Sequence, residues 1–552
     1  MTVVATRAGG DAFSVLRSRR AVIIALAGIL LVTGIAIVAA MRRTSTTFDE
    51  IVMVAGGARG YETGDWHLVP EHPPLVQYIY GLPVYLAGAE YPDESAVSDE
   101  LRTDMGYRYL YARAFYWVTG NDPERIAFLG RLPAVLFALG IVLLAFLYTR
   151  ALAGAGAGLL AAVLTASLPD VLAHGGVAYN DIALALVFAA AVWGIDAAVR
   201  RPSLARGVAA GVLIALALGV KNSAVALGPI AFVLLVWEMW ARRSDSAWRR
   251  AIAPVAVAAI AAVYLGLVAI YRGDLLLTEY RYALGFLLNQ VTERPAPAFL
   301  LGEVSRQGFW YFFPVAFLYK TSAGLHALVA LAAISFAAAL RSDRGRVLSS
   351  RLRAPFVGAV VFGAMLLTSD LNIGFRHALP LLPLLTVLTA VGIARLWHDA
   401  SRGLRAALVA AVVWPVLHVA SYYPFFLSYI SEYGPGEASA YEVLVDSSLD
   451  WGQGLLELRD FMELNDIPSV YLSYFGSALP GGYGIEHIPM LSYFPLPAQE
   501  RPAHAPQWYA VSATHLSGTY FEGDPFRRFR ELEPRHIIAR TIYLYRMTEL
   551  TR

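Results

Sequence analysis

The 552-residue chain has no cysteine. Disulfides, thiolate metal sites and cysteine nucleophiles are therefore excluded. Charged residues are also scarce, at 16% of the chain, whereas soluble domains carry roughly a quarter. The net charge of +2 gives no support to nucleic-acid binding. The chain instead is 57% hydrophobic, with a mean hydropathy of +0.53. That balance indicates a polytopic membrane protein.

Apolar segments long enough to cross a bilayer recur along the chain. The first, residues 21–41, follows a group of arginines as the core of a signal peptide would. Arg42 and Arg43 close it, however, where a cleavage site needs small residues, so we expect a retained span. About eleven spans are expected in all, each of roughly 20 residues. The others centre on residues 126–149, 155–173, 177–198, 205–220, 223–241, 251–271, 310–340, 354–370, 377–397 and 406–428.

The arginines between the spans predict the orientation, because short cytoplasmic loops are rich in Lys and Arg. With the N-terminus in the cytoplasm, alternate loops hold the arginines, and only Arg42 and Arg43 oppose the rule. Two domains follow, in a multi-pass protein of the cell membrane. Residues 1–430 form a membrane domain that includes the first extracytoplasmic loop, 42–125. Residues 431–552 form an extracytoplasmic α/β domain.

Ionisable residues gather at the outer ends of the spans, where they cost free energy unless they have a function. Each has a simpler explanation when taken alone. Acids cap helices, Pro73-Pro74 suits a turn before a helix, basic residues at span ends snorkel, and His377 would be structural. Acids and bases far apart in sequence nevertheless share one depth, so we expect them to form one site. They are Asp49, Glu50, Glu71, His72, Asp181, Lys221, Lys320, Arg376 and His377.

The motifs around these residues resemble a known family. Phe48-Asp49-Glu50, then Tyr61, then Glu71-His72-Pro73-Pro74-Leu75 is similar to the first luminal loop of the protein O-mannosyltransferases and the bacterial aminoarabinose transferases. Tyr179-Asn180-Asp181 resembles their second acidic site, and Lys221 matches a lysine one span later. The segments 376–383 and 446–453 resemble motifs of bacterial members.

The resemblance covers nearly the whole chain and implies a GT-C membrane glycosyltransferase, a polytopic α-helical fold. It also implies a donor sugar on polyprenyl phosphate and a single displacement with inversion. Two departures limit it. No β-trefoil repeats are recognisable, so a protein acceptor does not carry over. His72 stands where the aminoarabinose transferases have Lys, so their contact to an acceptor phosphate does not carry over either.

The chemistry of the residues agrees with that implication. Sugar transfer from a lipid phosphate to a hydroxyl needs a base on the acceptor and cations on the leaving phosphate. We expect Asp49 to be the base, supported by Glu50. Substrate binding is expected from two groups of side chains. Glu71 and Asp181 would bind hydroxyls or hold the loop, and Lys221, Arg376 and Lys320 would bind the lipid phosphate. His72 and His377 are also expected to bind substrate.

No cofactor is expected to be required, although Asp49, Glu71 and Asp181 are also ligands that suit a divalent metal. The partners expected are the lipid-linked donor, the bilayer, and an acceptor that is a lipid, a glycan or a protein. The main alternative function is a membrane transporter or lipid flippase of the cell envelope. A transporter would place its ionisable residues near the bilayer midplane, between matching halves, and this chain does neither.

The C-terminal region carries turn signals at Gly434-Pro435-Gly436 and Pro480-Gly481-Gly482. Between and after them the pattern predicts a helix over 454–464 and strands over 443–445, 469–475, 508–512 and 541–545. Asp446 and Asp450 suit a turn and a helix cap, while Asp450-Trp451 also suits contact with an acceptor sugar.

Overall fold

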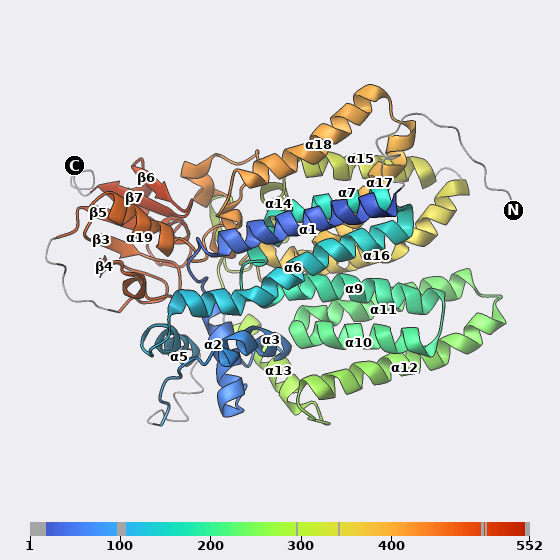
Figure 1. The fold of residues 1–552 in the computed structure, drawn as a ribbon, viewed down its shortest axis with the longest axis horizontal. Coiled ribbons are helices and arrows are strands. Elements are labelled where there is room, and N and C mark those ends of the chain that lie inside the picture. Colours follow the sequence, from blue (N-terminus) through green and yellow to red (C-terminus); the bar gives the residue numbers. More distant parts are fainter. Residues whose placement is uncertain are drawn as a thin grey trace.

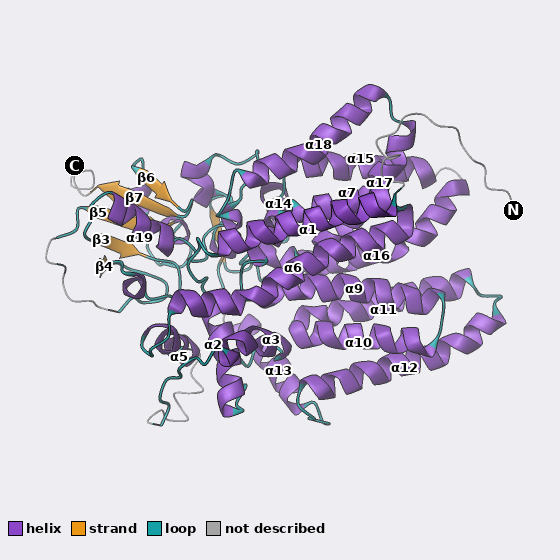
Figure 2. Cartoon of the chain, viewed as in Figure 1, coloured by secondary structure: helices purple, strands orange, loops and turns teal. Residues whose placement is uncertain are grey.

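The computed structural model describes residues 18–95, 106–293, 296–340, 343–497, 502 and 505–546. Long helices run side by side in a bundle, and a small domain with a sheet covers one end of it (Figures 1 and 2). This confirms the expected fold class, a mostly helical membrane protein with a small C-terminal sheet. Arg17, Arg341 and residues 96–105 of the first outer loop lie outside the described residues.

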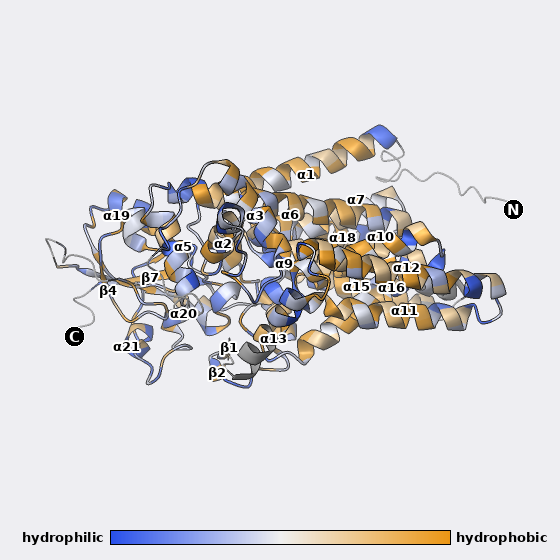
Figure 3. Ribbon diagram, turned by 90° about the horizontal axis from the view of Figure 1, so that it is seen from below, coloured by the Kyte–Doolittle hydropathy of each residue, from blue (hydrophilic) through white to orange (hydrophobic). Residues whose placement is uncertain are grey.

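All eleven predicted segments contain helix. The helices of the bundle are α1 (Arg19–Met41), α6 (Pro123–Ala153), α7 (Ala155–Ala166), α9 (Asn180–Arg200), α10 (Leu204–Val220), α11 (Leu227–Ala241), α12 (Ser246–Ile270), α14 (Phe312–Lys320), α15 (Ala323–Leu340), α16 (Asp343–Leu367), α17 (Leu381–Asp399) and α18 (Arg402–Ala420). Figure 3 shows apolar residues along these helices, with hydrophilic residues more frequent in the loops and at the domain-covered end.

Fewer of these segments are full-length spans than the sequence predicts. Among the described residues, eight helices are long and apolar enough to cross a membrane, or nine if the bent pair α14–α15 counts as one. The pair bends by 117° after Lys320. α7 has 12 residues and α10 has 17, so both are short for a bilayer of about 30 Å.

Glycines bring two of the bundle helices close together. Gly207 and Gly211 lie four residues apart on α10 and face α12, where a Cβ on Gly211 would lie 2.3 Å from the carbonyl oxygen of Ala259. Small residues at this spacing allow helix backbones to approach closely in membranes. The short helix α10 is therefore held against a longer neighbour.

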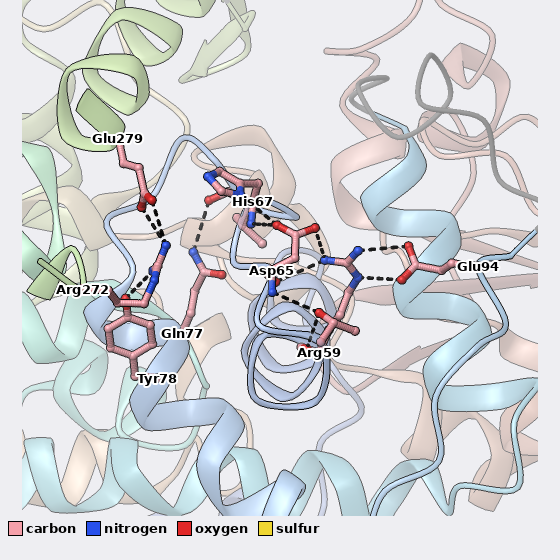
Figure 4. A network of polar contacts seen from close by, with 10 residues as sticks. Arg59, Asp65, His67, Gln77, Tyr78, Glu94, Arg272 and Glu279 are labelled. Atoms are coloured by element: carbon pink, nitrogen blue, oxygen red, sulfur yellow. Dashed lines mark hydrogen bonds and ion pairs between the residues drawn. The ribbon is translucent and has the colours of Figure 1, made fainter. Parts of the chain in front are cut away.

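The segment between α1 and α6, predicted to be the first outer loop, folds into α2 (Glu50–Thr63), α3 (Leu75–Leu86) and α5 (Tyr107–Trp117). These helices lie at the same end of the bundle as the C-terminal domain (Figure 1). Ion pairs and hydrogen bonds hold this loop in place (Figure 4). Arg59 on α2 pairs with Asp65 at 2.7 Å and with Glu94 at 2.8 Å. Arg272 at the end of α12 donates to the Tyr78 hydroxyl of α3 at 2.8 Å. The loop is thus tied to itself and to the bundle.

Short elements complete the membrane body and join it to the C-terminal domain. The short helices are α8 (Pro169–His174), η2 (Asn222–Ala226), η3 (Phe375–Ala378), η4 (Phe426–Ser428), η5 (Glu437–Glu442) and η6 (Asp446–Ser448). The helix α13 (Thr278–Glu293) and the hairpin of β1 (Ala298–Leu300) and β2 (Glu303–Ser305) form the second outer loop.

The C-terminal domain contains a five-stranded sheet in the order β4-β3-β5-β7-β6. β3 pairs in parallel with β4 and β5, whereas β7 is antiparallel to β5 and β6. The strands are β3 (Val470–Ser473), β4 (His487–Pro489), β5 (Trp508–Ser512), β6 (His536–Ile538) and β7 (Ile542–Arg546). The domain's helices are α19 (Leu455–Leu464), η7 (Pro480–Tyr483), α20 (Ala513–Leu516) and α21 (Arg527–Arg530).

Most of the predicted C-terminal elements are confirmed: β3, β5, β7 and α19 lie where the sequence places them. The strand expected over 443–445 is wrong. These residues are buried between η5 and η6, and the Val443 carbonyl accepts from the Leu301 amide of the second outer loop at 3.0 Å. They are apolar because they pack between the two domains, not because they join the sheet. β4 and β6 are only three residues each and give too short a pattern to recognise.

Candidate active site

Asp49 lies immediately before α2, where the chain leaves α1 and turns under the C-terminal domain. Its Oδ1 accepts a hydrogen bond from the Tyr109 hydroxyl at 3.0 Å. Its Oδ2 lies 3.4 Å from Nη2 of Arg376. The side chain remains 23% exposed. Asp49 is thus held in place from two sides while a ligand can still reach it.

Arg376, on the short helix η3, links two carboxylates that are far apart in sequence. Its second terminal nitrogen, Nη1, lies 3.6 Å from Oδ2 of Asp181. Its guanidinium also lies over the rings of Trp451, at 4.2 Å, and Tyr179, at 4.9 Å. Burial lowers the pKa of Arg376, but the charge of Asp181 outweighs it and holds the pKa above its usual range. A fixed positive charge therefore sits beside Asp49 at every physiological pH.

Lys221 supplies the second cation of this group. The helix α10 ends at Val220 because Lys221 adopts an extended backbone, with φ −157° and ψ 139°. Its ammonium reaches Oδ1 of Asp181 in the first turn of α9, at 2.5 Å. Asp181 is 1% exposed and therefore needs these partners. The structure thus brings Asp49, Asp181, Lys221 and Arg376 together, as the sequence predicts.

Glu71 and His72 line the same region from the first outer loop. Glu71 forms an ion pair with Arg108 of α5. His72 Nε2 lies 2.7 Å from the Tyr179 hydroxyl, and its Nδ1 lies 3.3 Å from Nδ2, the side-chain amide nitrogen of Asn180. An amide nitrogen only donates, so Nδ1 accepts and Nε2 carries the proton. Burial and the charge of Lys221 lower the pKa of His72 to about 3, so it is neutral.

Buried polar atoms without a hydrogen-bond partner concentrate around these residues. Leaving such a group unpaired costs about 1–3 kcal/mol, so several at one place indicate a site that a polar ligand completes. Burial also raises the pKa of Glu71, one of the carboxylates concerned. Within the described residues, the unpartnered atoms are Oε2 of Glu71, Oδ1 of Asn180 and Asn222, Oδ2 of Asp181, Nε and Nη1 of Arg376 and Nε2 of His377.

Two predicted site residues lie instead in fully satisfied buried networks. Glu50 is bound at 2.8 Å by both Nε and Nη2 of Arg131, and it also accepts from the amide nitrogens of Ala178 and Thr47. Lys320 donates to three carbonyl oxygens, those of Leu427, Tyr429 and Ser448, at 2.8–3.0 Å. Both side chains are 0% exposed. In this conformation neither has a free atom to offer a substrate.

Four residues at the site were not assigned to it from the sequence: Arg108, Tyr109, Tyr179 and Trp451. Arg108 and Tyr109 lie in Tyr107-Arg108-Tyr109, a basic residue between aromatics in the predicted outer loop. That local combination is the signal that could have pointed to them. From the sequence, Trp451 is expected only as a contact for an acceptor sugar; its position over Arg376 depends on how the C-terminal domain docks and was not predicted.

The carboxylates do not converge as metal ligands in the described residues. No group of three or more His, Asp or Glu side chains there is arranged to hold a metal ion. The guanidinium of Arg376 lies between Asp49 and Asp181, where a shared cation would have to bind. The geometry therefore does not fit a metal held by Asp49, Glu71 and Asp181.

The segment 446–453 joins the C-terminal domain to this site. The Trp451 carbonyl accepts from the Phe48 amide at 2.8 Å, next to Asp49. Asp450 accepts from the Thr514 amide at 3.2 Å, and the Thr514 hydroxyl accepts from the Asp446 amide at 2.9 Å. Burial raises the pKa of Asp446 to about 6 and that of Asp450 to about 7. Both acids thus serve the junction, although neither caps α19 as the sequence predicts.

Solved structures of similar architecture have low overall similarity to this chain. ArnT from Cupriavidus metallidurans, bound to undecaprenyl phosphate, is 14% identical with a TM-score of 0.48; the match covers 73% of this chain and 65% of that one. The oligosaccharyltransferase of Archaeoglobus fulgidus in complex with Zn and sulfate is 16% identical with a TM-score of 0.44, covering 75% and 54%. The chain therefore spans less than two thirds of their lengths, and these likenesses carry no argument by themselves.

The sequence comparisons are more informative. No curated protein matches the chain. Residues 112–271, which include Asp181 and Lys221, match the family model of the dolichyl-phosphate-mannose-protein mannosyltransferases. Over these residues the match confirms the predicted resemblance to the membrane glycosyltransferases of the protein mannosyltransferase superfamily.

Proposed function

We propose that this protein is a membrane glycosyltransferase that moves a sugar from a polyprenyl-phosphate donor to an acceptor hydroxyl. The observation that carries the proposal is the position of Asp49. It is a partly exposed carboxylate held next to Arg376, a buried cation with two nitrogens that have no hydrogen-bond partner among the described residues. The match of residues 112–271 to the mannosyltransferase family supports the same reaction class.

In this reaction Arg376 and Lys221 bind the phosphate of the donor. Nε and Nη1 of Arg376 have no hydrogen-bond partner among the described residues, so each offers a donor to a phosphate oxygen. Lys221 adds a compact charge that Asp181 holds in position. As the bond between the sugar and the phosphate breaks, both electrons go to the phosphate oxygen, and these cations stabilise the charge that develops there.

Asp49 acts on the acceptor. Its carboxylate takes the proton of the acceptor hydroxyl while that oxygen forms a bond to the anomeric carbon, on the face opposite the leaving phosphate. One displacement therefore inverts the anomeric centre and needs no nucleophile from the protein. Tyr109 and Arg376 orient the carboxylate. Glu71, His72 and Asn180 line the space that we assign to sugar hydroxyls, and His377 adds a free nitrogen there.

We place this site on the extracytoplasmic side of the cell membrane, with the N-terminus in the cytoplasm. The turns that join α9 to α10, α11 to α12 and α17 to α18 lie at the end of the bundle away from the C-terminal domain (Figure 1). These turns are rich in arginine, which is typical of cytoplasmic loops. The site and the C-terminal domain lie at the opposite end.

Transfer from a panel of radiolabelled polyprenyl-phosphate sugars, in membranes that contain the full-length protein, tests the proposal. We expect the wild type to consume one donor and Asp49→Asn to lose at least 100-fold in rate, about the contribution of a general base. Asp93→Asn is the matched control, because Asp93 is an acid of the same loop that accepts from the Ser95 amide and, among the described residues, contacts none of the site. Equal rates for wild type and Asp49→Asn, or no consumption of any donor by the wild type, contradict it; the second result favours the transport interpretation.

A further inference from the structure

Asp49 borders two chemically different groups of side chains. The first is the pair of cations Arg376 and Lys221. The second is a chain of aromatic rings that begins at its neighbour Phe48, which lies 5.4 Å from Tyr109 and 6.0 Å from Tyr493 of the C-terminal domain. Tyr493 in turn lies 4.5 Å from Tyr520. We call Tyr493, Tyr520 and Phe475, which stacks on Tyr520 at 5.4 Å, the aromatic platform.

Tyr493 combines an exposed ring with a fixed backbone. Its side chain is 50% exposed, unusual for a large aromatic residue so close to buried rings. Its backbone amide donates to Nε2 of His515 at 3.1 Å, and the His515 Nδ1 lies 2.8 Å from the Ser473 hydroxyl. Burial lowers the pKa of His515 to about 3, so its ring stays neutral and keeps an acceptor for that amide.

The residues on either side of Tyr493 are fixed as well. The Leu491 carbonyl accepts from the Ser473 hydroxyl at 2.7 Å, and the Ser492 hydroxyl accepts from the Tyr474 amide at 3.1 Å. The Pro495 carbonyl accepts from Arg113 at 3.0 Å. The backbone is thus tethered at Leu491, Tyr493 and Pro495, and the side chain of Ser492 adds a fourth contact. An exposed ring on such a backbone is pre-organised, so little conformational entropy is lost when a ligand stacks on it.

The platform carries polar groups at its edge. The Tyr520 hydroxyl donates to Asp446, and Tyr109 donates to Asp49. Apolar ring faces flanked by carboxylate and hydroxyl oxygens match a pyranose or furanose ring, which has apolar C–H faces and hydroxyls around its rim. A phosphate group fits this surface poorly, because the carboxylates of Asp446 and Asp49 at its edge would repel the phosphate.

We propose that the aromatic platform is the acceptor subsite and that the acceptor is a carbohydrate, stacked on Tyr493 with one hydroxyl directed at Asp49. This inference rests on the proposed function. It makes the C-terminal domain part of the acceptor site.

The test compares ring-bearing and open-chain acceptors of similar hydroxyl content, in membranes supplied with the labelled donor. Methyl glycosides of glucose, mannose, galactose and arabinose are set against sorbitol, mannitol and a Ser/Thr peptide. We expect a methyl glycoside to have the lowest KM. Tyr493→Ala should raise that KM roughly three- to tenfold, the value of one stacking contact, without the same change in donor KM. Tyr493→Trp should restore it. Tyr433→Ala is the control, because Tyr433 is equally exposed, at 53%, but contacts His326 of α15.

A binding measurement separates this inference from the proposed function. Saturation-transfer NMR on the detergent-solubilised Asp49→Asn protein needs no turnover. We expect ring protons of the preferred glycoside to receive saturation, and to lose it when Tyr493→Ala is added. Glycoside binding without any donor consumption would overturn the proposed function alone. Equal use of polyols and glycosides, labelling of the peptide alone, or an unchanged acceptor KM in Tyr493→Ala would overturn the acceptor subsite.

Discussion

Two clusters of buried ion pairs lie at opposite ends of the helix bundle. At the outer end, Asp49, Asp181, Lys221 and Arg376 leave several polar atoms without hydrogen bonds and keep Asp49 partly exposed. At the end that we assign to the cytoplasm, Arg353 binds Asp196 at 2.9 Å and also binds Glu238. Arg200 and Arg242 supply those acids with second partners.

The difference between the clusters is one of completeness, not of charge. Both acids of the inner cluster have both carboxylate oxygens engaged, so that cluster ties α9, α11 and α16 together. Of its ion-pairing side chains, only Arg353 has an unpartnered buried atom among the described residues, Nη2. The outer cluster is as well balanced in charge but is short of hydrogen bonds. Buried charge in a membrane protein therefore indicates a site only where its hydrogen-bonding capacity is unfilled and it can be reached.

The largest effect should come from breaking the inner cluster. Arg353→Met leaves Asp196 and Glu238 with fewer partners in a buried place, and we expect a loss of about 3–5 kcal/mol of stability. Thermal unfolding in detergent would measure it. Arg200→Met is the control, because the Arg200 side chain is 31% exposed and its contact with Asp196, at 3.4 Å, is longer than that of Arg353. An unchanged melting temperature in Arg353→Met would remove the structural role of the inner cluster.

Arg376→Lys should change stability less than Arg353→Met but should clearly weaken binding of the donor substrate. The lysine keeps the charge beside Asp49 and Asp181 but replaces the guanidinium, with its several N–H donors, by a single ammonium. Each lost charge-assisted hydrogen bond is worth about 1.5–3 kcal/mol, so the donor KM should rise roughly 10- to 100-fold. Initial rates at varied donor concentration measure this. If Arg376→Lys keeps the wild-type donor KM, the Arg376 guanidinium does not bind the donor phosphate.

Asp446, at the junction with the C-terminal domain, should make the stability of the protein depend on pH. Its folded pKa, about 6, is above the ordinary 3.8 because of burial, so the folded state binds the proton more tightly. Stability from this group is full below about pH 3.8 and is lost as pH rises through 6. Asp446→Asn stays neutral, so its melting temperature should exceed that of the wild type above pH 6 and converge with it near pH 4. A constant difference at all pH values would contradict this.

Much of this molecule was predictable from its sequence. Apolar length gives the bundle, and the coincidence of Asp49, Asp181, Lys221 and Arg376 at span ends predicts the cluster that the structure forms. The roles of neighbours were not predictable. Asp49 and Glu50 are adjacent in sequence, yet only Glu50 is enclosed, because Arg131 on α6 happens to face it. The sequence likewise predicts that Lys320 binds substrate, whereas in the structure its ammonium is taken up by three backbone carbonyls. Such partners cannot be predicted from the sequence, because every residue has a backbone carbonyl.

The smallest effect is expected at the contact between the domains, where an exposed and a buried interaction lie close together. Arg43 pairs with Glu457 of α19 at 3.1 Å, but the arginine side chain is 54% exposed. Exposed pairs contribute little, so Glu457→Gln should change stability by less than about 0.5 kcal/mol. Ser45, two residues from Arg43, is buried and donates to the Gly452 carbonyl at 2.8 Å while accepting from the Leu455 amide at 3.0 Å.

Ser45→Ala should therefore cost more than Glu457→Gln, about 1–3 kcal/mol, because it leaves the buried Leu455 amide without its partner. The Gly452 carbonyl keeps its second donor, the Tyr474 hydroxyl. Denaturation of both variants in the same detergent gives the comparison. A larger loss in Glu457→Gln would mean that surface charge holds the domains together. The expected order instead means that the C-terminal domain is fixed by buried hydrogen bonds beside Asp49. Fixed in that way, the domain can hold Tyr493 at a constant distance from the base.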